Sequence, residues 1–544
     1  MWIAFGAALV SLLLKDRKRL ICFIALSAAC LLFTAFTFSY VGTDVMSYHF
    51  PMQDLLRHGW NPVYTATIEE FDVLVNGWTL NKIHALFLPR LNALCGALMG
   101  ASTGLYIADS FLNYAMVFSL LATAFDFSRR FWRLNPTMSV LFALCVTCTT
   151  KFTAFLSGYA DYLSYAGIMI MLFTAVLYIK ERRIADLWLF GIAFAVSSLA
   201  KSTGLVVAVL WGLLILPVLF KDRSFWVAAL IIAVYVIIVG FSPLMTSLIN
   251  YSCPFYPTMS FSSAHPVIDI TSDFTGNADA LKMGYVARTL YAWVSPALAV
   301  KLCSVAYGQP DFMPEFTVCG GVAGFGAAFR VMLLLGAVAL VFSKKNLVTV
   351  VCLFVFLTTL VTPLKYVGFS RYFLQIWAVP ILALFNLAAN PSFNLRNGAV
   401  KMGFRALVVF APVAIAFLCI MRSIAFYGRS IAEKRCRQAA ISCLKAKSSV
   451  WGSDGKIANS YSLSRRLSVG GINYLPDRDI AEEVPRFSYD GQYMWAAIGN
   501  ARAEAVEVDE EFPLVNSPME ILRFPWRKAY SGLPHVLWSG FGCK

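Results

Sequence analysis

The chain has 544 residues, of which 59% are hydrophobic and only 14% are charged. A soluble protein of that size cannot hide so much apolar surface in its core, so the composition predicts a multispanning membrane protein. The formal net charge of +15 would suit a nucleic-acid partner. However, the Lys and Arg residues form short clusters between apolar runs rather than one basic face, so we expect no nucleic acid among its partners.

Apolar runs recur along the whole membrane part of the chain. Each has roughly 14 to 22 residues, enough or nearly enough to cross a hydrocarbon layer of about 30 Å. They lie at residues 1–14, 20–40, 108–127, 137–150, 162–179, 187–200, 205–220, 225–246, 328–343, 347–364, 373–390 and 404–421. The pattern predicts an all-α multispanning membrane domain with about twelve transmembrane helices. The first run carries its charges after it, the reverse of a cleavable signal, so we expect a retained span.

Basic clusters follow every second apolar run. They are Lys15/Arg17/Lys18/Arg19, Arg129/Arg130/Arg133, Lys180/Arg182/Arg183, Lys221/Arg223, Lys344/Lys345 and Arg396/Lys401. The positive-inside rule assigns these connections to the cytoplasm. The alternation then puts residues 41–107, residues 247–327 and the chain from 422 onward on the outer side.

Two domains are predicted. Residues 1–421 form the membrane domain, with its two outer loops at 41–107 and 247–327. Residues 422–544 are polar and punctuated by Gly, Pro and Ser, which predicts a small extracytoplasmic domain of α/β or irregular structure.

Asp44 follows the second run directly, in the stretch Thr43-Asp44-Val45-Met46-Ser47-Tyr48-His49-Phe50-Pro51. An ionisable side chain at a membrane interface is a functional hypothesis by default. Asp44 could accept a proton from a hydroxyl, bind a metal or be a solvated loop residue. His49 is as well explained by a structural role as by a catalytic one.

Four cations lie at the outer ends of runs, where the insertion rule disfavours them. They are Lys151, Lys201, Lys365 and Arg371. Each alone is explained by snorkelling to the headgroups. Together they favour an anionic ligand, because an ammonium is a compact point charge and a guanidinium a bidentate fork for phosphate oxygens.

Asp161 is a second carboxylate at the outer end of a run, among Tyr159, Tyr162 and Tyr165. Tyrosines at this depth are typical of an aromatic belt. Asp161 is open to two interpretations: it neutralises Lys151, or it orients a sugar hydroxyl.

Several of these stretches resemble, in order, signatures of the bacterial membrane glycosyltransferases of the GT-C superfamily. Asp44 to Pro51 is similar to the first-loop pattern Asp-x-x-x-Tyr-His-x-Pro of that family. The other matching stretches are Ala200 to Thr203, Asn250 to Pro257, Gly320 to Gly326 and Ser370 to Leu374. The resemblance covers about residues 40–390 and does not extend to the tail.

The resemblance implies an enzyme of the bacterial cytoplasmic membrane whose site faces the periplasm or exterior. Its donor would be a polyprenyl-phosphate-linked sugar and its acceptor a glycan or lipid hydroxyl. Asp44 would be the catalytic base, and in-line displacement would invert the anomeric centre. The substrate-binding residues would be Tyr48, His49, Lys151, Asp161, Lys201, Lys365, Arg371 and Tyr372.

The first loop lacks the adjacent acidic pair of several relatives and offers only Glu69-Glu70 further along. The site is therefore expected either to work without a metal or to be completed by Asp161, and dependence on Mg²⁺ or Mn²⁺ stays open.

Two other classes of function fit the same sequence. A transporter or flippase of a lipid-linked saccharide would also need outer-face cations, but it predicts a polar pathway at mid-span. An outer-face acyl or phosphoethanolamine transferase would make His49 rather than Asp44 indispensable.

Overall fold

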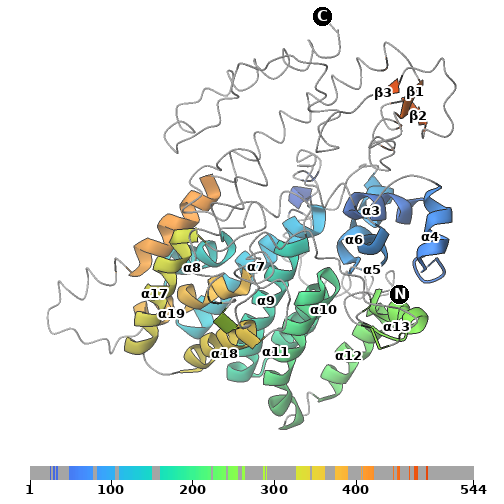
Figure 1. The fold of residues 1–544 in the computed structure, drawn as a ribbon. Helices are drawn as coiled ribbons and strands as arrows, with labels where there is room; N and C mark the ends of the chain where they lie inside the picture. The colour runs from blue at the N-terminus through green and yellow to red at the C-terminus, as the bar shows by residue number, and fades with distance from the viewer. Residues whose placement is uncertain are drawn as a thin grey trace, which may run out of the picture.

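The structure is a computed structural model of the full chain (Figure 1). The continuous segments that it describes are 48–65, 67–76, 82–87, 89–103, 110–149, 160–221, 225–239, 243–254, 326–343, 346–361, 374–389, 408–421, 450–453 and 471–475. It also describes residues 25, 28–30, 32, 34, 256, 260, 261, 263, 286, 287, 290, 406, 445, 465, 468, 486 and 487.

Most of the described helices pack into one bundle, with a core that joins all of its parts. Its helices are α7 (Ser110–Phe131), α8 (Pro136–Thr147), α9 (Ala160–Glu181), α10 (Ile184–Ala200), α11 (Ser202–Lys221), α12 (Phe225–Val239), α17 (Gly326–Phe342), α18 (Leu347–Val361), the 3₁₀ turn η4 (Leu374–Trp377) and α19 (Ala378–Ala388). A further apolar helix runs over Val408–Met421. The described part of residues 48–421 contains no strand, so the predicted all-α character of the membrane domain is confirmed there.

Two helices, Phe111–Phe131 and Ala160–Glu181, are long and apolar enough to cross a membrane, by length and composition. The other apolar helices found by the same criteria are shorter, at 10–17 residues. The count of about twelve spans therefore stays a prediction. The predicted run 225–246 includes α12 (Phe225–Val239) and the start of α13 (Pro243–Tyr251), and residues 240–242 between them lie outside the described part of the chain. Pro243 begins the second helix, a position where its missing N–H is harmless.

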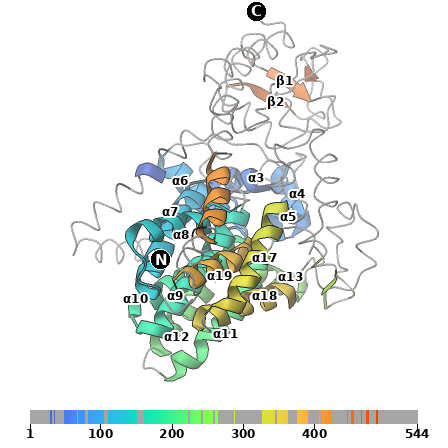
Figure 2. The same ribbon diagram turned by 90° about the vertical axis from the view of Figure 1, so that its left-hand side faces the viewer.

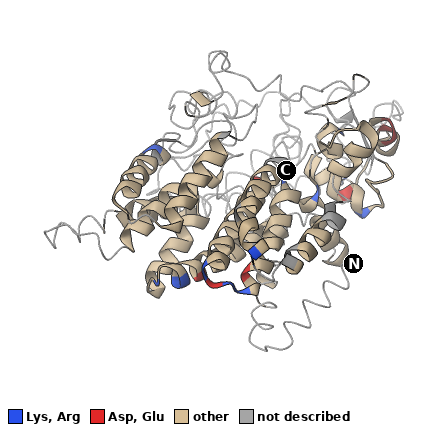
Figure 3. Cartoon of the chain, turned by 90° about the horizontal axis from the view of Figure 1, so that it is seen from below, with Lys and Arg blue, Asp and Glu red and all other residues tan. Residues whose placement is uncertain are grey.

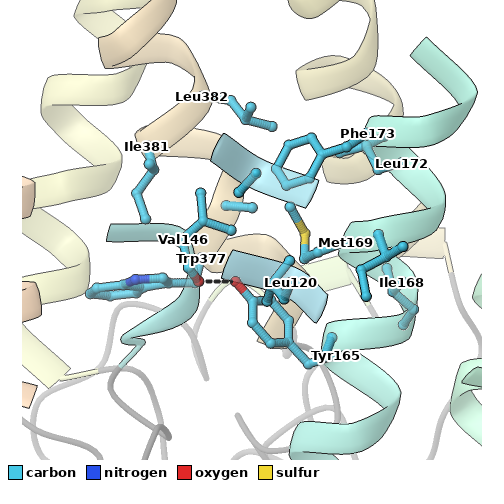
Figure 4. Close-up of a cluster of buried hydrophobic side chains, with 14 of the residues drawn as sticks. Leu120, Val146, Tyr165, Ile168, Met169, Leu172, Phe173, Trp377, Ile381 and Leu382 are labelled. Atoms are coloured by element: carbon cyan, nitrogen blue, oxygen red, sulfur yellow. Dashed lines mark hydrogen bonds between the residues drawn. The ribbon is translucent and has the colours of Figure 1, made fainter. Parts of the chain in front are cut away.

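α9 is the central helix of the bundle. In its most apolar window 94% of residues are buried inside the protein, against 44% for α7, so α9 touches other helices on all sides. Figure 4 shows Ile168, Met169, Leu172 and Phe173 of α9 among side chains of the neighbouring helices. Such all-round apolar character is what a fully enclosed helix requires.

One end of the bundle gathers polar side chains. Arg130, near the end of α7, donates hydrogen bonds to Glu181 at the end of α9 (Nη2 to Oε2, 2.8 Å) and to Asp186 at the start of α10 (Nη2 to Oδ2, 2.6 Å). Asn386 of α19 accepts hydrogen bonds from Trp132 (3.1 Å) and from Asn346, just before α18 (2.8 Å). Figure 3 shows charged residues concentrated at helix ends rather than along the bundle helices. Two of the basic clusters predicted to be cytoplasmic therefore meet at one end, the basic end.

The remaining helices form a separate lobe with its own core. They are α3 (Phe50–Arg57), α4 (Ile68–Val75), α5 (Lys82–Phe87), α6 (Leu91–Thr103) and α13. A capping box starts α4, in which Thr67 and Glu70 satisfy each other's backbone N–H. The lobe thus combines described residues from two of the three segments that the sequence assigned to the outer side, 41–107 and 247–327. It connects to the bundle at the end opposite the basic end, since α6 leads into the start of α7 and α13 follows the end of α12.

The described tail contains a small parallel sheet. Strand β1 (Val450–Ser453) pairs with β2 (Asn473–Leu475) and β3 (Arg486–Phe487), in the order β2-β1-β3. In Figures 1 and 2 these strands lie beyond the lobe, on the side away from the bundle.

Candidate functional site

Two of the expected substrate-binding residues meet at the lobe end of the bundle. The Lys201 ammonium forms an ion pair with the Asp161 carboxylate. Asp161 lies in the first turn of α9, where the helix dipole favours a negative charge. Lys201 is the single extended residue between α10 and α11, and its backbone carbonyl accepts the first hydrogen bond of α11 from Leu205 (3.1 Å). Both side chains are largely buried, at 8% and 18% exposed.

The tight turn at Lys201 depends on small residues. A Cβ on Gly204 would overlap the Ser197 carbonyl oxygen at the end of α10 and the Ser164 hydroxyl of α9. A Cβ on Gly167 would lie only 3.0 Å from the Ser197 Cβ. The close approach of α9, α10 and α11 is what holds Lys201 over the first turn of α9.

The tyrosines beside Asp161 are core residues. Tyr162 donates its hydroxyl to the Thr147 carbonyl (2.9 Å), and Tyr165 to the Val146 carbonyl (2.6 Å, Figure 4). Both are at most 1% exposed. The aromatic-belt interpretation is therefore wrong for these two residues, which instead cap the last carbonyls of α8 and fix the start of α9 against it.

The predicted motif around Tyr48 and His49 lies in the lobe. Both side chains are buried, and their rings are in contact, with centroids 4.4 Å apart. The Tyr48 ring also stacks on His84 of α5, at 4.9 Å. His84 was missed in the sequence, because a lone histidine in an outer loop carries no periodicity or spacing that would join it to Tyr48.

The motif from Asn250 to Pro257 enters the same core. The Tyr251 and Tyr256 rings stack at 4.2 Å, and Phe87 packs edge-on against both, at 5.4 and 5.2 Å. Burial, with Tyr256 and Glu69 nearby, raises the pKa of Tyr251 to about 12. Tyr251 is therefore a protonated phenol at neutral pH.

Arg90 is a second residue that sequence reasoning missed. It precedes α6, is 2% exposed and donates to the last carbonyls of α5, Ala85 (3.4 Å) and Leu86. Its guanidinium lies 5.2 Å from the centre of the Trp60 ring. Burial lowers the pKa of Arg90, while the carbonyls and the aromatic face hold the cation. Arg90 thus ties α5, α6 and the Trp60 turn together.

A third missed residue comes from the tail. Arg465 donates from Nε to the Asp54 Oδ2 on α3 (2.7 Å) and from Nη2 to His58 Nε2 (2.6 Å). His58 Nδ1 lies 2.7 Å from the Asp54 backbone carbonyl, which assigns its proton to Nδ1. No sequence pattern links Arg465 to a position 411 residues earlier.

Five of the sequence-predicted site residues lie outside the described residues. They are Asp44, Lys151, Lys365, Arg371 and Tyr372. The structure therefore joins Asp161 to Lys201, and Tyr48 to His49, and it leaves the interpretation that Asp161 neutralises Lys151 untested. Among the residues described, no group of three or more His, Cys, Asp or Glu side chains could hold a metal ion.

Comparison with known proteins assigns no class. No model of a protein family matches the chain, and neither a curated protein nor a solved structure matches it.

Proposed function

We propose that the protein is an inverting membrane glycosyltransferase, which moves a sugar from a polyprenyl-phosphate lipid to an acceptor hydroxyl at the outer face of the bacterial cytoplasmic membrane. The observation that carries the proposal is the shared core of the lobe. Tyr48 of the first motif and Tyr251 and Tyr256 of the third, some two hundred residues apart in the sequence, belong to one buried cluster. The first and third signatures thus share one core, which supports their common origin in the resemblance, while the second, Ala200 to Thr203, lies in the bundle.

A membrane location is supported by the outer surface of the bundle. Large aliphatic side chains are more than half exposed on three of its helices: Leu230 and Ile232 on α12, Leu334 and Val341 on α17, and Leu353 and Leu357 on α18. Monomeric soluble proteins rarely leave such extended apolar faces in water. Contact with lipid tails accounts for them, and the gathering of Arg130 and Lys180 at the basic end favours the orientation with the lobe outside.

The chemistry needs a base and a cation. In the proposed reaction Asp44 takes the proton of the acceptor hydroxyl as its oxygen bonds to the anomeric carbon. The bond from that carbon to the phosphate oxygen breaks, and the lipid phosphate leaves as an anion. Lys201 would hold that phosphate together with Lys365 and Arg371. An ammonium has three N–H donors, so a phosphate oxygen can share Lys201 with Asp161.

Transfer of a labelled sugar from purified polyprenyl-phosphate donors, with the protein in detergent, tests the proposal. The assay is run with and without a chelator, so that it also decides whether Mg²⁺ or Mn²⁺ is needed. A catalytic base contributes about 10²–10⁴-fold, so Asp44→Asn should reduce turnover by about that factor and leave donor binding largely intact. Asp126→Asn is the matched control, because Asp126 is an exposed carboxylate at the basic end. Retention of more than about a tenth of transfer by Asp44→Asn would refute its role as base.

The same preparation separates the competing classes. Absence of transfer from every donor, with saturable lipid translocation in vesicles, would favour a flippase. A flippase would need polar side chains that face a pathway at mid-span. Thr174, near the middle of the central helix α9, instead donates to the backbone carbonyl of Ile170 in its own helix (2.8 Å). Loss of activity in His49→Ala but not in Asp44→Asn would favour an acyl or phosphoethanolamine transferase.

A further inference from the structure

The buried carboxylate of Asp54 receives its cation from the tail. Asp54 lies in the middle of α3 and is 2% exposed, and the Arg465 Nε donates to it at 2.7 Å. The imidazole of His58, one turn later, is 3.6 Å from the other carboxylate oxygen. Arg465 therefore binds a carboxylate and an imidazole that α3 presents one turn apart.

The burial of Asp54 makes this contact costly to lose. A carboxylate out of water is stable only when it is paired and hydrogen-bonded, so removal of a charged donor to it is destabilising. His58, with its proton on Nδ1 and directed at a backbone carbonyl, is a poor substitute for the guanidinium. The Arg465 guanidinium is therefore one of the groups that hold the buried Asp54 carboxylate in place.

The contact lies one to two turns from the candidate site. Tyr48 and His49 immediately precede α3, which carries Asp54 and is followed by His58 at its carboxyl end. A helix of eight residues is only marginally stable by itself and depends on tertiary packing. Its placement depends on its packing in the lobe and on the side chain that reaches Asp54.

We infer that Arg465, from the described part of the tail, docks on α3 beside the candidate site, and that it is a positioning residue that orients α3, and with it the Tyr48–His49 segment, through Asp54. The effect of Arg465 on catalysis rests on the proposed function, whereas its docking on α3 does not. Docking and catalytic effect are therefore tested by separate measurements.

Hydrogen exchange of the full chain in detergent tests the docking. Arg465→Ala should raise amide exchange in peptides covering residues 48–58 by about tenfold, which corresponds to a coupling of about 1.4 kcal/mol. Peptides from α9 should be unchanged. Arg183→Ala, which removes an exposed arginine paired with Glu181 at the basic end, is the control and should leave 48–58 unaffected. In the double variant Asp54→Asn/Arg465→Ala, amide exchange over residues 48–58 should be no faster than in whichever single variant exchanges faster. Additive effects, or unchanged exchange over 48–58, would overturn the docking.

Sugar transfer then tests the positioning. Arg465→Ala should lower kcat about tenfold per folded molecule with the donor KM little changed, since the guanidinium does not touch the substrate. Arg465→Lys should recover part of that loss, because it restores the charge without the fork. Full activity in Arg465→Ala, with wild-type transfer intact and 48–58 loosened, would overturn the positioning role. If the wild type transfers no sugar but exchange behaves as expected, the proposed function and the catalytic positioning fail together, and the docking of the tail onto α3 stands.

Discussion

Asp161 and Lys201, forty residues apart in the sequence, form an ion pair where α9 begins and α10 ends. The pair is mostly enclosed by protein, and it joins the first turn of the central helix to the tight turn between its two neighbours. Each side chain thus has a structural partner as well as a proposed role toward the donor.

Removal of the lysine should be costly on its own. Lys201→Met leaves the Asp161 carboxylate buried without its cation, and we expect a loss of about 3 kcal/mol in the free energy of unfolding. Asp161→Asn combined with Lys201→Met should recover part of that loss, since neither charge is then stranded. Thermal unfolding of the four variants of the cycle gives the coupling. A double variant as unstable as the sum of the single variants would show that the two side chains do not interact.

The tight turn gives a second prediction. Gly204→Ala should destabilise the bundle by about 1–3 kcal/mol, because its methyl group would overlap the Ser197 carbonyl and force α10 and α11 apart. Gly212→Ala is the matched control within the same helix. Its Cβ would meet only the Phe194 ring, at 3.7 Å, and alanine gains about 1 kcal/mol of helix propensity over glycine. The unfolding midpoint in detergent should therefore fall for Gly204→Ala and rise for Gly212→Ala. A shift of both midpoints in the same direction would contradict the close packing of Gly204 against Ser197.

At the basic end, Arg130→Ala should cost about 3–5 kcal/mol, because Asp186 is buried and depends on that guanidinium. Arg129→Ala removes the neighbouring arginine, which is exposed and bonds to the Leu134 carbonyl. The control should change the free energy of unfolding by less than about 1 kcal/mol. Equal losses would mean that the network around Arg130 contributes no more than a surface contact.

Orientation can be measured with single cysteines. Tyr64→Cys introduces a thiol at a lobe position that is 81% exposed, and a membrane-impermeant maleimide should label it in intact cells. Arg183→Cys, at the basic end, should be labelled only after the cells are opened. The wild-type chain gives the background from its own thirteen cysteines. Labelling of Arg183→Cys alone in intact cells would reverse the assigned topology.

The helices of the bundle were largely predictable from the sequence. Runs of apolar residues bounded by charges gave α7 to α11 within a few residues, because length and polarity are local properties of the chain. The sequence did not predict the separate helix α13, since its residues continue an apolar run and Pro243 alone does not mark the start of a helix. The aromatic-belt interpretation of Tyr162 and Tyr165 failed because depth along a helix does not say which face is covered.

The contacts of the candidate site were only partly predictable. Asp161 and Lys201 were singled out by charge in an apolar context, and that signal is strong because such charges are rare there. Their mutual pairing, the stack of Tyr48 on His84, and the reach of Arg465 to Asp54 depend on tertiary packing between distant segments. No periodicity in one chain encodes such contacts. The roles given to Asp44, Lys365 and Arg371 stay predictions.

The enclosure of α9 has a consequence for biogenesis. A segment that is apolar on every side can dissolve in lipid before its neighbours arrive, and these must then wall it in while the chain is still being inserted. In the proposed membrane location, synthesis would bring α7 and α8 into the bilayer before α9, whereas η4, which also packs against α9, would follow much later.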